Sequence, residues 1–266
     1  MRRRSSEMIR FILVCTYLVL YLILSLPVLL IEWIIGKFNP GLRDRSCKAL
    51  VGWGFRCIGH IAGTRLIVKG RENIPTDTAV LYVGNHRSFF DVVLSLSLFP
   101  GITGYVAKKE MNKAPILRLW MRFIHCQFLD RDNIKEGMKT IMACITQVKS
   151  GHSLCIFPEG TRNKVNDTFL PFHEGSFKIA EKGGVPIVPL TIVNSAAVFE
   201  DYLPKLRLRK ATVVFDFGTP IYVNTLDKDI RKSLANYVSG IISERYFQLK
   251  EEYFPEASQI PSREKP

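Results

Sequence analysis

The sequence has 266 residues, with 37 Lys and Arg against 24 Asp and Glu, which gives a net charge of +13. Hydrophobic residues make up 47% of the chain and charged residues 23%, a composition that excludes a disordered protein and supplies a sizeable core. The six cysteines are scattered and form no C-x-x-C pair, which excludes a zinc ribbon or disulfide framework and favours a reducing compartment.

The most apolar part of the chain lies near its N-terminus. Residues 11–31 carry no charge and would form a helix about 31 Å long, close to the thickness of the bilayer hydrocarbon. A cleaved signal peptide would have a shorter apolar stretch and a small-residue cleavage site, and a buried core helix is rarely apolar on every face. We therefore predict a retained membrane helix with a cytoplasmic N-terminus, because arginines precede it. Its length does not decide whether the helix spans the bilayer or dips into it.

A second helix is predicted over residues 42–61. Leu50, Trp53 and Cys57 recur there near helical spacing, with basic residues between them. This pattern is typical of an interfacial helix on a membrane surface, and equally of a helix packed on a soluble domain. The residues Phe38-Asn39-Pro40-Gly41 predict the turn between the two helices.

From Thr64 onward, short β-rich runs alternate with helical ones. Strands are predicted over residues 79–83, 102–106, 127–129, 153–157, 187–193 and 212–217. Helices are predicted over residues 89–98, 115–123, 133–148, 176–181 and 226–250. This alternation predicts an α/β domain with a largely parallel sheet flanked by helices. The predicted organisation is an N-terminal membrane-associated helix pair (1–63), the α/β domain (64–250) and a polar, disordered tail (251–266).

Several chemistries are excluded because their motifs are absent. The sequence contains no G-x-S-x-G nucleophile elbow, no H-E-x-x-H and no phosphate-binding P-loop. The five histidines show no spacing typical of metal ligands, so no metal site is predicted. The positive charge is dispersed and no nucleic-acid-binding motif is present, so no nucleic-acid partner is expected.

An H-x4-D pattern, His86 to Asp91, directly follows the predicted strand 79–83. Five residues of helix turn through about 500°, so the two side chains can meet only if His86 lies in the turn before the helix. Asp91 would then fix the imidazole tautomer and leave the other ring nitrogen as a base. The alternative is that Ser88 and Asp91 form a capping box and His86 is an ordinary loop histidine. The two interpretations are compatible, because the carboxylate has two oxygens.

A second polar segment follows the predicted strand 153–157. It contains Glu159, Gly160, Thr161 and Arg162, in a turn that can expose backbone N–H groups next to a cation and a hydroxyl. Such a turn is suited to binding an anion. The alternative is an ordinary polar loop.

Single cations follow two more of the predicted strands. Lys108 and Arg131 are each, taken alone, typical of solvated surface charges, and Lys108 is not distinguishable from Lys109. Because ligands bind at the carboxyl ends of the strands in an open α/β sheet, we expect these cations to gather beside His86. The sequence therefore predicts a base beside a phosphate site, next to a membrane segment.

Four blocks in this order resemble the lysophosphatidic acid acyltransferase (1-acyl-sn-glycerol-3-phosphate acyltransferase) family of H-x4-D glycerolipid acyltransferases. They are N-H-R-S-F-F-D (85–91), F-L-D-R (128–131), F-P-E-G-T-R (157–162) and V-P-I-V-P (185–189). The resemblance extends over roughly residues 78–195, and the N-terminal helix pair is also similar to the family. One departure is Cys126, where the family often has glycine, which bears on the geometry of that turn.

The resemblance implies transfer of a fatty acyl chain from acyl-CoA or acyl-carrier protein to the sn-2 hydroxyl of lysophosphatidic acid, giving phosphatidic acid for phospholipid biosynthesis. It implies that His86 is the general base and that Asp91 orients it. It further implies phosphate binding by Lys108, Arg131 and Arg162, and a loop that contacts the glycerol or shapes the site, made of Glu159, Gly160 and Thr161. Because a thioester is already activated, no cofactor or metal is expected besides the acyl donor.

Other interpretations remain open. Within the same class, the acceptor could be glycerol-3-phosphate or another lysophospholipid. A non-enzymatic basic membrane adaptor would explain the charge and the apolar N-terminus, but not the groups at the strand ends. The expected partners are the bilayer, lysophosphatidic acid and the acyl donor, with the catalytic domain on the cytoplasmic face of the membrane.

A basic segment near the C-terminal third of the chain is also open to two interpretations. Lys205, Arg207 and Arg209 alternate with leucines, which predicts a strand with these charges on one face. They would contact headgroups or the nucleotide end of coenzyme A, or they would keep an edge strand from aggregating.

Overall fold

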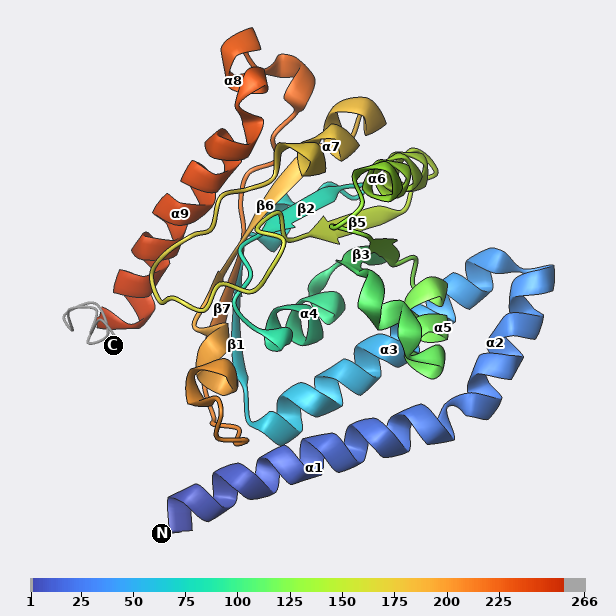
Figure 1. The fold of residues 1–266 in the computed structure, drawn as a ribbon, viewed down its shortest axis with the longest axis vertical. Coiled ribbons are helices and arrows are strands. Elements are labelled where there is room, and N and C mark those ends of the chain that lie inside the picture. Colours follow the sequence, from blue (N-terminus) through green and yellow to red (C-terminus); the bar gives the residue numbers. More distant parts are fainter. Residues whose placement is uncertain (1, 256–266) are drawn as a thin grey trace.

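The computed structural model describes residues 2–255, and its centre is one seven-stranded sheet (Figure 1). The strand order is β1-β7-β6-β2-β5-β3-β4, and every neighbouring pair is parallel except β6 and β7. The largely parallel sheet is as predicted. The strands are β1 (Arg65–Lys69), β2 (Leu81–Gly84), β3 (Thr103–Lys108), β4 (Gln127–Leu129), β5 (Ser153–Ile156), β6 (Ile187–Val193) and β7 (Thr212–Phe217).

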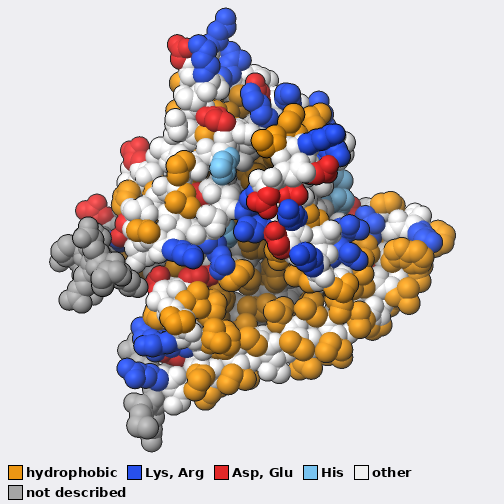
Figure 2. All heavy atoms as spheres, in the orientation of Figure 1, with side chains coloured by type: hydrophobic (Ala, Val, Ile, Leu, Met, Phe, Trp, Pro, Cys, Tyr) orange, Lys and Arg blue, Asp and Glu red, His pale blue; other side chains and the backbone are white. Residues whose placement is uncertain are grey.

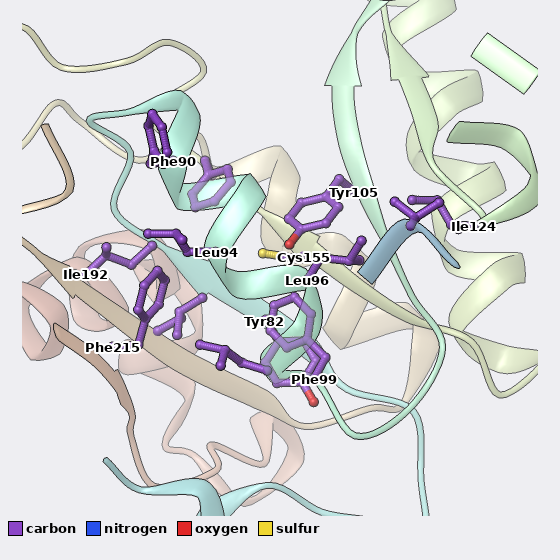
Figure 3. Close-up of a cluster of buried hydrophobic side chains, with 14 of the residues drawn as sticks. Tyr82, Phe90, Leu94, Leu96, Phe99, Tyr105, Ile124, Cys155, Ile192 and Phe215 are labelled. Atoms are coloured by element: carbon purple, nitrogen blue, oxygen red, sulfur yellow. The ribbon is translucent and has the colours of Figure 1, made fainter. Parts of the chain in front are cut away.

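Helices cover both faces of the sheet, because the central strands are apolar on both sides. In β2, Tyr82 packs into the cluster with α3, α4 and α5, whereas Leu81 and Val83 pack into the cluster with α6, α7 and α9. Figure 3 shows part of the first cluster around Tyr82 and Tyr105. Such continuous apolar strands are typical of a parallel sheet buried between helices. The helices are α4 (Phe89–Ser95), α5 (Pro115–Phe123), α6 (Ile134–Lys149), α7 (Lys178–Gly183), α8 (Lys228–Lys232) and α9 (Leu234–Tyr253).

Three helices, not a pair, precede the sheet: α1 (Arg2–Leu24), α2 (Leu26–Phe38) and α3 (Pro40–Ala62). The single helix predicted over 11–31 is therefore wrong, since it breaks at Ser25. Pro27 explains the break, because proline lacks the N–H for the helical hydrogen bond and its ring clashes with the preceding turn. Asn39 caps α3 where the turn was predicted, its side chain accepting from Leu42 N–H at 3.0 Å.

The amphipathic segment 42–61 lies within α3, which packs on the α/β domain. Cys47, Val51 and Ile58 are buried in the core cluster, so the packed-helix alternative describes this face. Trp53 lies on another face of α3 and remains half exposed.

Contacts at both ends hold α1 against the domain. Near its N-terminus, the buried Glu7 pairs with Arg209 at 2.8 Å and Arg207 at 3.5 Å. Just past its C-terminus, Ser25 Oγ accepts a hydrogen bond from Trp120 Nε1 at 2.8 Å.

The strand expected around Arg207 and Arg209 is wrong: residues 205–211 form no strand, because these arginines turn toward α1.

One side of α1 and α2 exposes apolar side chains. In the orientation of Figure 1, they form an apolar rim along the edge of the molecule where these helices lie (Figure 2). The segment Arg4–Leu24 is long and apolar enough to cross a membrane. The exposed side chains include Ile9, Ile12, Leu13, Leu20, Leu24, Leu30, Ile31, Trp33 and Ile34.

The sequence analysis differs from the structure at three further elements. The strand β1 was not predicted, although it pairs with β7 along its whole length. The helix predicted over 226–250 is broken at Ser233 into α8 and α9. Helix α9 continues to Tyr253, so the expected disorder is wrong for residues 251–253, and residues 256–266 lie outside the described part of the chain.

Candidate active site

The H-x4-D segment connects β2 to α4. His86 lies in the turn before the helix, as predicted, and its Nδ1 is 2.8 Å from Asp91 Oδ2. The same carboxylate oxygen accepts hydrogen bonds from the backbone N–H groups of Arg87, at 2.7 Å, and Ser88, at 2.8 Å. Ser88 is the N-cap of α4 in a complete capping box. Asp91 therefore both caps α4 and holds His86, but it does so with one oxygen rather than with two.

This arrangement determines which nitrogen of His86 is available. Asp91 is completely buried, and Oδ2 acts as the acceptor for three donors, so His86 Nδ1 carries the ring hydrogen. The Nε2 lone pair is then free to accept a proton.

Two further contacts hold the His86 ring and its turn in place. The ring stacks on Phe157, with centroids 4.3 Å apart. Asn85 connects the turn to β6 through two 2.8 Å hydrogen bonds with Ile192.

Glu159 joins the histidine turn to the loop after β5. It is 4% exposed, and its carboxylate accepts hydrogen bonds from His86 N–H at 2.7 Å and Leu170 N–H at 3.1 Å. Burial raises the pKa of Glu159, and these two hydrogen bonds act in the opposite direction. Both carboxylate oxygens are thus engaged by the backbone. Of the two roles expected for Glu159, its position matches the shaping of the loop.

A polar cavity of about 280 Å³ lies beside this loop. Lys108, Arg131, Gly160, Thr161 and His173 contribute to its lining. Gly160 has a φ of 74°, and a Cβ there would lie 3.1 Å from His173 Nε2, so glycine is needed both for the turn and for the close approach. Glu159 also lines the cavity. Because Glu159 is hydrogen-bonded to His86 N–H, the cavity lies next to the His86 turn.

The structure distinguishes the two adjacent lysines. Lys109 pairs with Asp130 at 2.8 Å and with Asp132 at 3.4 Å. For Lys108, which lines the same cavity, no ion pair is found within the described residues 2–255. Lys108 is therefore the lysine whose charge remains available to a bound anion.

Arg162 occupies a different position from the other two predicted cations. Its Nη1 pairs with Glu200 at 3.1 Å, and its guanidinium lies 3.6 Å from the centre of the Phe89 ring. It lies beside the N-terminus of α4, not in the lining of the polar cavity. Of the three cations expected to bind the phosphate, Arg162 is thus the one outside this cavity, because the acid and the aromatic ring hold it against α4. Its part in phosphate binding stays a prediction.

Glu200 is a site residue that the sequence analysis missed. Its two oxygens accept hydrogen bonds from Ser88 Oγ at 2.6 Å and Phe89 N–H at 2.7 Å, in addition to its pairing with Arg162. Burial raises the pKa of Glu200, and the Ser88 hydrogen bond partly offsets this effect. Glu200 belongs to no motif, and only the folded chain brings it to the start of α4.

A second, largely apolar cavity of about 410 Å³ adjoins the polar one. Arg131, Gly160 and His173 line both cavities, so they lie between a charged compartment and an apolar one. His173 was also missed, although it lies within the residues 78–195 that the family resemblance covers. The apolar lining comes largely from α6, with Ile134, Met138, Ile141, Met142 and Ile145.

Comparisons with known proteins identify relatives of this chain. A family model described as Acyltransferase matches residues 65–193, which include every residue of both cavities. A Mycoplasma pneumoniae protein named probable 1-acyl-sn-glycerol-3-phosphate acyltransferase is 32% identical over 259 residues, covering 92% of this chain and 94% of its own. A Helicobacter pylori 1-acyl-sn-glycerol-3-phosphate acyltransferase is 29% identical over 229 residues, covering 83% of this chain and 92% of its own.

A solved structure shares the fold. The 1-acyl-sn-glycerophosphate (LPA) acyltransferase PlsC from Thermotoga maritima superposes with a TM-score of 0.74 at 22% identity, covering 93% of this chain and 96% of that one. The near-complete coverage includes the N-terminal helices as well as the sheet. With the near full-length relative at 32% identity, the chain belongs to the 1-acyl-sn-glycerol-3-phosphate acyltransferase family.

Proposed function

We propose that this protein transfers a fatty acyl chain from acyl-CoA or acyl-carrier protein to the sn-2 hydroxyl of lysophosphatidic acid, and so produces phosphatidic acid. The observation that carries the proposal is the 2.8 Å contact between His86 Nδ1 and Asp91 Oδ2 at the carboxyl end of β2. It leaves the Nε2 lone pair of His86 next to the loop that lines a cavity with Lys108 and Arg131, which is what a base next to a bound phosphate requires.

In this mechanism His86 Nε2 removes the proton from the sn-2 hydroxyl as the oxygen attacks the thioester carbonyl. Asp91 stabilises the imidazolium that forms, and the imidazolium then protonates the departing thiolate. Proton transfer of this kind contributes about 10²–10⁴-fold to the rate. A thioester is activated already, so we assign no cofactor and no metal ion to the reaction.

We assign the polar cavity to the phosphate of lysophosphatidic acid. Lys108 and Arg131 would supply the charge, with Thr161 as a further donor, since charge-assisted hydrogen bonds to phosphate are stronger than neutral ones. Arg162 would stabilise the start of α4 through Glu200 and Phe89, within reach of the headgroup side of the site. The adjoining apolar cavity suits an acyl chain.

The apolar side of α1 and α2 would place the protein on the bilayer. Because Glu7 and Ser25 hold the two ends of α1 to the domain, we favour helices that lie along one leaflet over a helix that leaves the domain and crosses the membrane. The arginines at residues 2–4 favour the cytoplasmic face.

An assay of the purified full chain in mixed micelles tests the reaction. Thiol release from acyl-CoA is expected only when lysophosphatidic acid is present, and phosphatidic acid should appear in equal amount. A panel with glycerol-3-phosphate, other lysophospholipids and acyl-carrier protein then identifies acceptor and donor. If thiol is released only with another acceptor, that acceptor is the substrate and lysophosphatidic acid is not. If no acceptor causes thiol release, the protein is the non-enzymatic membrane adaptor instead.

A further inference from the structure

A second polar cluster lies on the opposite edge of the sheet from His86. It consists of Asp44 in α3, His125 in the residues before β4, and His152 in the residues before β5. The strands β2, β4 and β5 point the same way, so His86 follows the carboxyl end of its strand whereas these two histidines precede the amino ends of theirs. The cluster has no place in the proposed acyl transfer.

The three side chains aim their ligating atoms at one point. Asp44 Oδ2 is 2.8 Å from His125 Nε2 and 3.5 Å from His152 Nε2. All the ligating atoms of the cluster lie within 4.8 Å of one another. Bonds of about 2.0–2.1 Å around a tetrahedral ion separate its ligands by about 3.4 Å, so only small movements are needed. One is a tilt of a ring, because the two imidazoles are stacked at 4.2 Å with planes 19° apart.

The hydrogen bonds around His152 show which of its nitrogens is free. Ser150 Oγ donates to the Gln147 carbonyl at 2.7 Å, so it is left to accept from His152 Nδ1 at 3.1 Å. Nδ1 therefore carries the hydrogen, and Nε2 has a lone pair facing the Asp44 carboxylate. Two acceptors that face each other repel unless a cation lies between them.

The other two members of the cluster also direct a ligating atom at this point. His125 Nε2 is buried and, despite its short distance to Asp44, makes no well-directed hydrogen bond with any described residue. Arg43 donates two hydrogen bonds to Asp44 Oδ1, at 2.9 and 3.1 Å, which orients the carboxylate and leaves Oδ2 for the cluster. Such outer hydrogen bonds are typical of metal ligands. His125 also holds a left-handed backbone, with a φ of 61°, which is uncommon for a residue other than glycine.

We propose that Asp44, His125 and His152 bind one divalent transition-metal ion, with Zn²⁺ as the best match to two imidazoles and a carboxylate. Magnesium and calcium are disfavoured, because they prefer ligand sets made of oxygen. The histidine side chains are 21% and 27% exposed, so water can supply a fourth ligand. The ion would tie helix α3, which carries Asp44, to the end of the sheet opposite the reaction centre.

Metal binding by the purified full chain tests the proposal directly. The protein is stripped with a chelator, and Zn²⁺ affinity is measured by competition with a chromogenic chelator and stoichiometry by elemental analysis. We expect one Zn²⁺ per chain. His152→Gln and His125→Asn should each weaken binding by at least about 100-fold, because loss of even an outer partner of a ligand costs about 10–100-fold. Asparagine is chosen at 125 because it tolerates a left-handed backbone.

His60→Ala is the matched control, since His60 is an exposed histidine on α3, the same helix as Asp44. This variant should bind Zn²⁺ like the wild type, and Zn²⁺ should raise the unfolding temperature of both but not that of His152→Gln. A wild-type chain that takes up no Zn²⁺ would overturn the proposal, as would equal affinity in the variants. Unfolding that responds to pH between 5 and 7 but not to Zn²⁺ would show instead that a proton joins the cluster.

Discussion

The hydroxyl of Ser88 donates a hydrogen bond to Glu200 Oε2 at 2.6 Å, which joins the start of α4 to the segment after β6. Glu200 also accepts from Phe89 N–H and pairs with Arg162, so one partly buried carboxylate connects the H-x4-D turn to the P-E-G-T-R loop. The geometry of His86 therefore depends on a residue far from it in the sequence.

Glu200→Gln should impair catalysis more than stability. Glutamine keeps one acceptor oxygen but loses the charge that holds Arg162, and a hydrogen bond to a charged group is worth about 1.5–3 kcal/mol. We expect kcat to fall by about 10–100-fold while the folded state persists. Steady-state kinetics and thermal unfolding measure the two effects. A variant with wild-type kcat would show that Glu200 does not position the site.

His86→Ala and Asp91→Asn test the proposed base. His86→Ala should lower kcat by about 10²–10⁴-fold. In Asp91→Asn the amide oxygen can still accept from Arg87 and Ser88, but the charge that stabilises the imidazolium is lost, so we expect nearly as large a decrease. Single-turnover thiol release measures the rate. His60→Ala is the control, and an active His86→Ala enzyme would refute the mechanism.

The lysine pair provides a matched test of the phosphate site. Lys108→Ala and Arg131→Ala should raise KM for lysophosphatidic acid about 10-fold or more with little change in kcat, since each would lose a charge-assisted contact. Lys109→Ala should change KM little, because Asp130 and Asp132 already hold that lysine. Equal effects of the two lysine variants would place the phosphate elsewhere.

Arg162→Ala should behave differently from the cavity variants. Its removal leaves Glu200 without its ionic partner next to α4, so we expect kcat to fall as well as KM to rise. Arg162→Lys keeps the charge but loses the planar group over Phe89, and should recover only part of the activity. An increase in KM alone would mean that Arg162 contacts only the phosphate.

The pH dependence of stability tests the environment of Glu159. Its pKa is raised above the ordinary 4.5 by burial, so the folded protein binds this proton more readily than the unfolded chain does. The stabilisation is complete below the ordinary pKa and is lost as pH rises through the folded-state pKa. Relative to Glu159→Gln, which does not titrate, the wild type should gain stability as pH falls from neutral towards 4.5. Thermal unfolding of both proteins across this range measures the difference, and a constant difference would contradict the assignment.

The apolar side of α2 should determine membrane binding. Leu30 and Trp33 are 60% and 51% exposed, and each would bury apolar area worth about 1.5–3 kcal/mol in a bilayer. The double variant Leu30→Glu, Trp33→Glu should weaken binding to anionic vesicles at least about 10-fold in a flotation assay. Tyr222→Glu, at a similarly exposed position before α8, is the control. Unchanged flotation of the double variant would show that this side of α2 is not the membrane-binding surface.

Local patterns were enough to predict much of the fold. The central strands and the parallel sheet follow from apolar runs that alternate with helices, because both faces of such strands must be buried. Strand β1 escaped prediction because its partner β7 comes more than a hundred residues later, and α1 ends early because Pro27 interrupts an otherwise apolar helix. The residue preferences of a short segment carry no information about a strand partner that lies far away in the sequence.

The sequence by itself determined the His86–Asp91 pair, because five residues across a strand-to-helix turn bring the imidazole to its carboxylate. It also determined that cations would follow the strands, since the carboxyl ends of parallel strands share one edge. Only the tertiary structure decided that Lys108 rather than Lys109 is available, that Glu200 holds Arg162, and that Asp44 meets two distant histidines. Those contacts join segments far apart in the chain, and their partners are set by how the helices pack on the sheet.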